Sequence, residues 1–149
     1  MKIVIADASC LITLENINEI DLLPKLYEQI VVTPEVADEV GSSLPEWVDQ
    51  ISSPNQTLID QLSFILEIGE ATSIALALEL PDCLLIIDEK KGRRTAKELG
   101  IVITGTFGVV MQGLDGGFIA APDTIVVRLE AAGFRISDVL KARMRCQIH

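Results

Sequence analysis

Short apolar runs alternate with longer amphipathic segments along this chain. Because the runs are rich in β-branched residues and too short for typical helices, they predict buried strands at 2–6, 29–33, 83–88 and 101–104. Helical spacing, with capping residues, prolines and glycines at the ends, predicts helices at 10–16, 20–28, 34–40, 55–66, 69–80, 89–100, 105–114, 123–132 and 137–145. Residues 42–54, which hold two prolines near their ends, are predicted to form a loop.

The regular alternation of strands and helices predicts an α/β fold. We expect a three-layer α/β/α architecture, in which a central parallel sheet of about four strands is covered by helices on both faces. A length of 149 residues and a hydrophobic content of 49% fit a single domain spanning 1–149. Ligand sites in such sheets form beyond the carboxyl ends of the strands, and this edge is therefore where functional residues are sought.

Cysteine, histidine and hydropathy patterns exclude several classes. Three scattered cysteines without a CxxC motif, and one histidine at the last position, disfavour a disulfide framework and a Cys/His zinc site. The chain lacks an apolar run near the ~18 residues of a membrane span, and its N-terminus has no signal-peptide pattern. We therefore expect a cytoplasmic protein without membrane association.

Charge is distributed unevenly along the chain. The net charge is −10, and it divides into −15 over residues 1–89 and +5 over residues 90–149. Half of the basic residues after position 89 fall in the segment KKGRRTAK, which begins at Lys90. This segment is either a solvated helix face or a phosphate-contacting patch beside an acidic site.

Four carboxylates occupy unusual positions. Asp7 ends the first strand, Asp88 ends the third with Glu89 beside it, Glu70 borders the buried face of its helix, and Glu39 lies near an apolar stripe. Each also has an ordinary explanation. Asp7 or Asp88 can cap the following helix, Glu70 can favour the positive end of a helix dipole, and Glu39 can be a surface acid.

Taken together, these acids predict a cation site. Two acids at strand ends and two on inward-leaning helix positions converge on one edge of the sheet. Clustered carboxylates repel one another unless a cation neutralises them, and Mg²⁺ or Mn²⁺ prefers such oxygen ligands. The chemistry that follows is metal-assisted phosphodiester hydrolysis, which needs neither a histidine nor a cysteine nucleophile.

The sequence resembles the PIN-domain ribonuclease superfamily, and within it the small prokaryotic PIN-like nucleic-acid-binding proteins related to VapC-type toxins. The resemblance covers nearly the whole chain. The segments that carry it, through their order and spacing along the chain, are IADASCLITL, LLPKLYEQIVVTPEVADEV, GEATSIALALEL, LLIIDEKKGRRTAKELGI and ITGTFGVV. One departure is that two of the four acids are glutamates, whose longer side chains would shift a metal.

The resemblance implies a set of functional residues. The implied catalytic acids are Asp7, Glu39, Glu70 and Asp88. The implied metal ligands are Asp7, Glu70, Asp88 and Glu89, with either Asp88 or Glu89 as the last ligand. The implied supporting hydroxyl residues are Ser9, Thr104 and Thr106. The basic segment adds four expected RNA phosphate contacts, Lys90, Lys91, Arg93 and Arg94.

These residues predict a Mg²⁺- or Mn²⁺-dependent endoribonuclease. By resemblance it acts on RNA as the toxin of a toxin–antitoxin pair, forms a homodimer and is held inactive by a cognate antitoxin protein. The alternative is a catalytically inactive PIN-like domain that serves as a nucleic-acid- or protein-binding regulatory module. Other doubly wound folds fit poorly, because DASCL lacks the second aspartate of haloacid-dehalogenase phosphatases and no GxGxxG motif follows the first strand.

Overall fold

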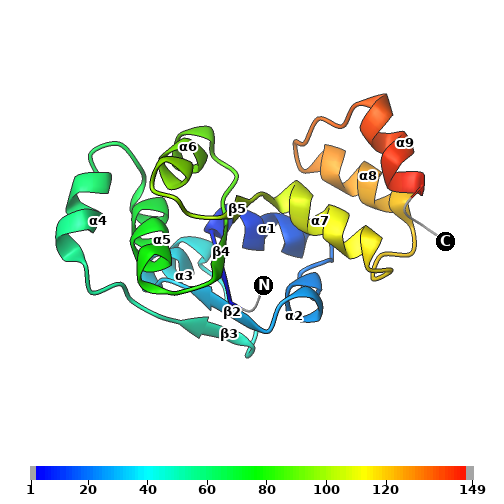
Figure 1. The fold of residues 1–149 in the computed structure, drawn as a ribbon. Coiled ribbons are helices and arrows are strands. Elements are labelled where there is room, and N and C mark those ends of the chain that lie inside the picture. Colours follow the sequence, from blue (N-terminus) through cyan, green and yellow to red (C-terminus); the bar gives the residue numbers. More distant parts are fainter. Residues whose placement is uncertain (1–2, 147–149) are drawn as a thin grey trace.

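The computed structural model describes residues 3–146, and its centre is a parallel sheet. The sheet contains five strands in the order β3-β2-β1-β4-β5 (Figure 1). The strands are β1 (Ile3–Ala6), β2 (Gln29–Val32), β3 (Val48–Gln50), β4 (Cys83–Ile86) and β5 (Ile103–Thr104). The predicted α/β fold with helices on both faces of a parallel sheet is confirmed, with one strand more than the four expected.

The additional strand, β3, lies inside the segment that was predicted to be a loop. Its three residues, Val-Asp-Gln, are partly or fully exposed and carry no strand-like run of apolar residues. The strand exists because it pairs with β2, with Val31 opposite Asp49, and because Ile51 N–H donates to the Val32 carbonyl at 3.0 Å. Tertiary pairing at the sheet edge, rather than local pattern, makes this segment extended.

The helices occur where the sequence predicts them, with ends shifted by a few residues. They are α1 (Ala8–Asn16), α2 (Leu22–Leu26), α3 (Pro34–Val40), α4 (Gln56–Leu62), α5 (Ile68–Glu79), α6 (Lys90–Glu98), α7 (Thr106–Asp115), α8 (Pro122–Ala131) and α9 (Asp138–Cys146). The start of α3 is as expected, because Thr33 Oγ1 accepts the Val36 N–H at 3.3 Å and Pro34 takes the first helical position. Gly41 ends α3 in the left-handed conformation with φ 73°.

The two faces of the sheet pack into separate cores. In β1, Val4 and Ala6 join a core with residues from α1, α2, α7, α8 and α9, whereas Ile5 joins a core with residues from α4, α5 and α6. This alternation follows from the two-residue period of a strand. Figure 1 shows the resulting layers, with α4, α5 and α6 on one side of the sheet and α1, α2 and α7 on the other.

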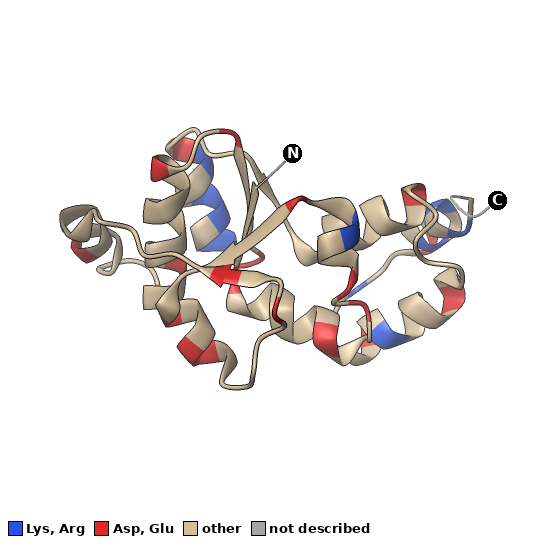
Figure 2. Ribbon diagram, turned by 90° about the horizontal axis from the view of Figure 1, so that it is seen from below, with Lys and Arg blue, Asp and Glu red and all other residues tan. Residues whose placement is uncertain are grey.

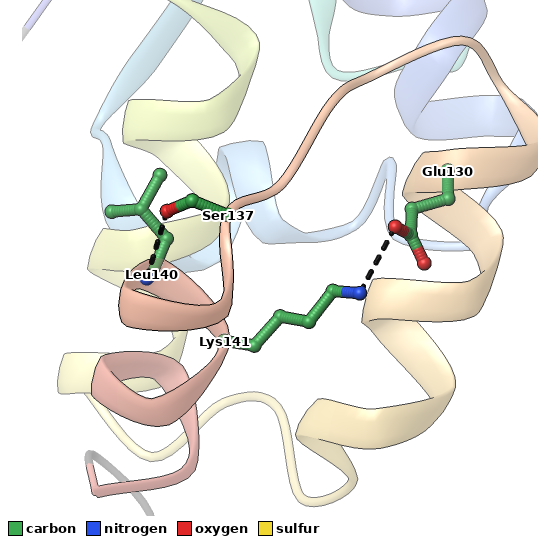
Figure 3. Close-up of polar contacts among 4 residues, drawn as sticks. All are labelled: Glu130, Ser137, Leu140 and Lys141. Atoms are coloured by element: carbon green, nitrogen blue, oxygen red, sulfur yellow. Dashed lines mark hydrogen bonds and ion pairs between the residues drawn. The ribbon is translucent and has the colours of Figure 1, made fainter.

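The C-terminal helices form a pair at one end of the molecule. Lys141 Nζ of α9 lies 3.1 Å from Glu130 Oε2 of α8, and the Leu140 N–H donates to Ser137 Oγ at 3.2 Å (Figure 3). Leu129 and Met144 are fully buried and tie this pair to the core shared with α7. No helix within residues 3–146 has the length and apolar character needed to cross a membrane.

Candidate active site

Asp7 joins the end of β1 to the start of α1. Its N–H donates to the Ile86 carbonyl at 3.1 Å, and its Oδ1 accepts the Ala8 N–H at 2.8 Å. Asp7 is therefore the N-cap of α1, as its ordinary explanation expects, and the helix begins at Ala8, two residues before the predicted start at position 10. Ser9 lies exposed within the first turn, where its hydroxyl reaches Asp88 Oδ2 at 3.4 Å.

The Asp7 carboxyl is only 6% exposed, and its surroundings disfavour a negative charge. Burial is the main reason why its pKa rises from 3.8 to about 6, and the charges of Glu39 and Asp88 raise it further. The hydrogen bond from the Ala8 N–H acts in the opposite direction. Both neighbouring charges that act on Asp7 are negative, so ionisation of Asp7 concentrates charge at the carboxyl end of the sheet.

Asp88 follows β4 and is held by the start of α7. Its Oδ1 accepts the Thr106 N–H at 2.7 Å, and its Oδ2 accepts the Thr106 hydroxyl at 2.5 Å. Thr106 is fully buried, which supports its predicted place beside the acids. Thr104 differs, because its hydroxyl packs against Gly108 of α7. The two hydroxyl residues, Ser9 and Thr106, thus connect α1 and α7 to the same carboxylate.

Glu89 has a different position from Asp88. Its side chain is exposed and accepts the Lys91 N–H at 3.0 Å, which makes Glu89, not Asp88, the N-cap of α6. The capping explanation considered for Asp88 is therefore wrong for this helix. The charge of Glu89 nevertheless acts on the site, since it contributes to raising the pKa of Glu70.

Glu70 lies in the first turn of α5 and is only 8% exposed. Burial, followed by the charge of Asp7, raises its pKa from 4.5 to about 7, while the Glu67 N–H, which its Oε1 accepts at 3.4 Å, lowers it. Glu39, near the end of α3, is exposed rather than turned toward the core as predicted. It still belongs to the cluster, because its charge raises the pKa of Asp7.

Two glycines in helices make room for the glutamates. A Cβ atom at Gly69 would lie 2.7 Å from Glu39 Oε1, which places the Glu39 carboxylate against the start of α5. A Cβ at Gly92 would lie 3.2 Å from Glu70 Oε2 and 2.5 Å from Ile87 Cδ1, so α6 can approach Glu70 closely only with glycine at this position. The Glu39 and Glu70 carboxylates therefore pack against α5 and α6 at positions where glycine has no side chain.

Gly105 leaves room for the Asp88 carboxylate in the same way. A Cβ at this position would lie 2.8 Å from Asp88 Oδ1 and 3.0 Å from Arg93 Nη1. Arg93 is half-buried, and its Nη1 donates to the Ile87 carbonyl at 2.7 Å. The guanidinium thus fixes the backbone immediately before Asp88. Its Nη1 donor is used in this contact, which leaves fewer donors for an external phosphate.

The remaining members of the basic segment face solvent. Lys90, Lys91 and Arg94 are exposed on α6. Figure 2 shows the basic residues gathered along α6 and near the C-terminal end, with acidic residues spread over the other elements. The basic segment starts next to Glu89 and the acidic cluster, and its exposure fits both a solvated helix face and a phosphate-contacting patch.

Residues 3–148 match a family model described as a PIN domain, DUF3368. The chain belongs to the PIN domain family. No curated protein sequence shows significant similarity to it. The predicted resemblance is thereby confirmed at the level of the family.

PIN domains are typically nucleases and are generally metal-dependent, so the donors of this cluster bear on whether it fits a divalent cation. Among residues 3–146, no three His, Cys, Asp or Glu side chains form a preformed metal-binding group. Mg²⁺ commonly uses one or two carboxylates and retains several waters, so it does not require such a group. Burial, and after it the neighbouring carboxylates, raises the pKa values of Asp7 and Glu70, so their ionised forms are disfavoured, and an oxygen-preferring cation would stabilise them.

The positions of the ion pairs in this PIN domain support the fit of a divalent cation to the acidic cluster. The ion pairs of the described residues join Lys141 to Glu130 and Arg145 to Asp123, both in the α8–α9 region. Neither involves the acidic cluster. The cluster consists of oxygen donors alone, which matches the preference of Mg²⁺ and Mn²⁺.

Sequence reasoning missed Gly69 and Gly92 as parts of this PIN-domain site. A signal was present, because glycine inside a helix costs about 1 kcal/mol relative to alanine and therefore points to a packing requirement. The sequence also did not indicate that Cys10 lies close to the acids. Its thiol is fully buried in α1 and stays neutral, because burial and the charges of Asp88 and Asp7 raise its pKa.

Proposed function

We propose that this PIN domain is a metal-dependent endoribonuclease that hydrolyses RNA phosphodiester bonds with Mg²⁺ or Mn²⁺. The observation that carries the proposal is the burial of Asp7 at the carboxyl end of β1, with a pKa raised to about 6 among carboxylates of like charge. The hydrogen bond to Ala8 stabilises the start of α1, but the buried negative charge of Asp7 lowers the stability of the metal-free fold. This arrangement is typical of a site that is completed by a cation.

In the proposed mechanism, Asp7 and Asp88 are the principal ligands from the strand ends, with Glu70 as the third acid. Asp88 is oriented by Thr106 and keeps a fixed direction because both of its oxygens accept hydrogen bonds. A bound cation would lower the pKa of the attacking water and stabilise charge on the transferring phosphoryl group. Glu39 and Glu89, which are exposed, lie at the rim and are suited to bind solvent around the ion.

The protonation states fit this role near neutral pH. Asp7 is largely ionised above pH 6, whereas Glu70, with a pKa of about 7, exchanges a proton in the physiological range. Glu70 therefore has to release its proton when it becomes a ligand of the cation at neutral pH.

The basic segment is the proposed contact for the RNA backbone. Lys90, Lys91 and Arg94 are exposed on α6, which begins one residue after Glu89 and so starts beside the acidic cluster. Exposed lysine and arginine side chains bind phosphates through counterion release. Arg93 has the secondary role, because one of its donors is occupied by the Ile87 carbonyl.

The biological setting that we propose is a toxin of a toxin–antitoxin pair, acting as a homodimer. The net charge of −15 over residues 1–89 would attract a basic segment of an antitoxin. The second candidate is an inactive PIN domain that binds nucleic acid or protein. Its support is that Asp7 and Glu70 each accept a helix-start backbone N–H, a role that needs no metal.

Calorimetric titration of Mn²⁺ into the metal-free protein separates these candidates. Asp7→Asn and Asp88→Asn are the test variants, and Asp115→Asn, an exposed acid at the other end of α7, is the matched control. The nuclease proposal expects binding by the wild type and the control, loss in both test variants, and manganese-dependent cleavage of single-stranded RNA. A wild type that neither binds Mn²⁺ nor cleaves RNA would support the inactive module.

A further inference from the structure

A groove of about 450 Å³ opens directly beside the acidic cluster. One wall is the turn 63–67 between α4 and α5, and the other is formed by Glu89 and Lys91 at the start of α6. Glu70 lines the groove as well as the cluster. The groove is therefore continuous with the acidic cluster, and a polynucleotide bound at the acids can continue into it.

An aromatic side chain is presented to water at the edge of the groove. Phe64 is 89% exposed, more than any other large hydrophobic residue of the described chain, and its neighbour Ile65 is 53% exposed. The turn that carries them is ordered by hydrogen bonds, since Ile65 N–H and Leu66 N–H both donate to the Leu62 carbonyl, at 3.0 and 2.9 Å. Leu62 and Leu66 supply the buried side chains of this turn, and Phe64 lies outside the core that they join.

We propose that Phe64 is a stacking platform for an unpaired base of the RNA, so that this groove binds the nucleotide next to the scissile phosphate. The inference rests on the proposed nuclease function and assigns to that site a base-binding side chain. Aromatic side chains bind splayed-out bases through their faces, whereas a base inside a duplex is already stacked and unavailable.

The charges in the groove favour a base over the RNA backbone. Glu67, Glu70 and Glu89 line it, and Lys91 is the one cation among its lining residues. Carboxylates repel phosphates but accept hydrogen bonds from the amino groups of cytosine, adenine and guanine. The phosphate is therefore directed toward Lys91 and α6, and the base toward Phe64.

The test compares RNA binding by variants at position 64 in Ca²⁺, which replaces the catalytic cation and prevents turnover. Phe64→Ala and Phe64→Leu remove the ring, Phe64→Trp restores an aromatic face, and Val127→Ala, at a residue 65% exposed on α8, is the control. The probe is a single-stranded RNA oligonucleotide without self-complementarity, beside its duplex. Oligonucleotides with one abasic position, moved along the strand, locate the stacked base.

We expect Phe64→Ala and Phe64→Leu to weaken single-strand binding about 5- to 150-fold, the range for loss of one base–aromatic stack. Phe64→Trp should restore it, and the control should not change it. At one position the abasic substitution and Phe64→Ala should not be additive. Unchanged thermal unfolding of all variants would show that the effect is local.

Unchanged RNA affinity of Phe64→Ala would overturn the proposal while leaving the nuclease function intact. Two forms of this result differ in what else the substitution changes. In the first, manganese-dependent cleavage persists but Phe64→Ala binds single strands as tightly as the wild type. In the second, Phe64→Ala leaves RNA affinity unchanged and abolishes self-association measured by sedimentation, which would assign the surface to a protein interface. A wild type that binds and cleaves no RNA would instead refute the proposed function itself.

Discussion

Asp7→Asn should make the metal-free protein more stable at neutral and higher pH. The native state raises the pKa of Asp7 from 3.8 to about 6, and the native protein therefore holds the proton more tightly than the unfolded chain does. Below pH 3.8 both states are protonated and the carboxyl costs nothing. As pH rises from 3.8 to 6 the penalty grows, and above pH 6 it reaches about 3 kcal/mol of unfolding free energy.

Asparagine removes this penalty with little change in shape. Its amide oxygen can still accept the Ala8 N–H that Asp7 Oδ1 accepts at 2.8 Å, so the N-cap of α1 is retained. We expect the variant to exceed the wild type in free energy of unfolding by up to about 3 kcal/mol at pH 8 and by only about 0.5 kcal/mol at pH 4. Saturating Mn²⁺ should narrow the difference at pH 8, because only the wild type gains stability from binding.

Urea unfolding at pH 4 and pH 8, with EDTA and then with Mn²⁺, measures both effects. Fluorescence of Trp47, the single tryptophan of the chain, and far-UV circular dichroism report the transition. Asp115→Asn, at an exposed acid, should show no such dependence on pH. If Asp7→Asn lowers stability equally at both pH values, the carboxylate acts only as a helix cap and the reasoning from clustered charge is refuted.

Three further predictions concern the same site. Thr106→Val should cost about 1–3 kcal/mol, because Asp88 loses a hydroxyl donor in a buried setting, and Thr106→Ser should recover most of this in urea unfolding. Mn²⁺ affinity, measured by calorimetry, should weaken as pH falls below about 7 and again below about 6, since Glu70 and Asp7 must lose protons to bind; equal affinity at pH 5.5 and pH 8 would contradict it. Gly105→Ala should reduce Mn²⁺ affinity at least tenfold, because the new Cβ would lie 2.8 Å from Asp88 Oδ1; an alanine variant that binds like the wild type would show that the backbone yields.

The core of the fold could be predicted because its signals are local. Runs such as IVIA and CLLI are apolar at every position, and only a strand with both faces buried requires that pattern in so short a segment. Asp7 and Asp88 were placed correctly because each directly follows such a run. The parallel order of the strands then brings their carboxyl ends to one edge, with Ala6 opposite Ile86.

Other features depend on partners that are distant in sequence. The strand β3 is extended because β2 lies beside it, and its own residues carry no signal. The contact between Thr106 and Asp88 spans 18 residues and two elements, so the sequence could suggest a hydroxyl near the site but not its acceptor. Glu39 was expected to lean inward, yet it is exposed and reaches the site only because Gly69 leaves its carboxylate room.

Helix capping and cation binding are compatible roles for the same acids. Asp7 uses Oδ1 for the Ala8 N–H, and Glu70 uses Oε1 for the Glu67 N–H, which fixes each carboxylate in direction without occupying its second oxygen. The buried side-chain nitrogen and oxygen atoms of residues 3–146 all have hydrogen-bond partners, so the second oxygens lie where solvent or an ion can reach them. A cap that orients an acid therefore lowers the cost of assembling the site, because less side-chain freedom remains to be lost when an ion binds. The Asp7→Asn experiment separates the two roles, since asparagine keeps the cap and removes the charge.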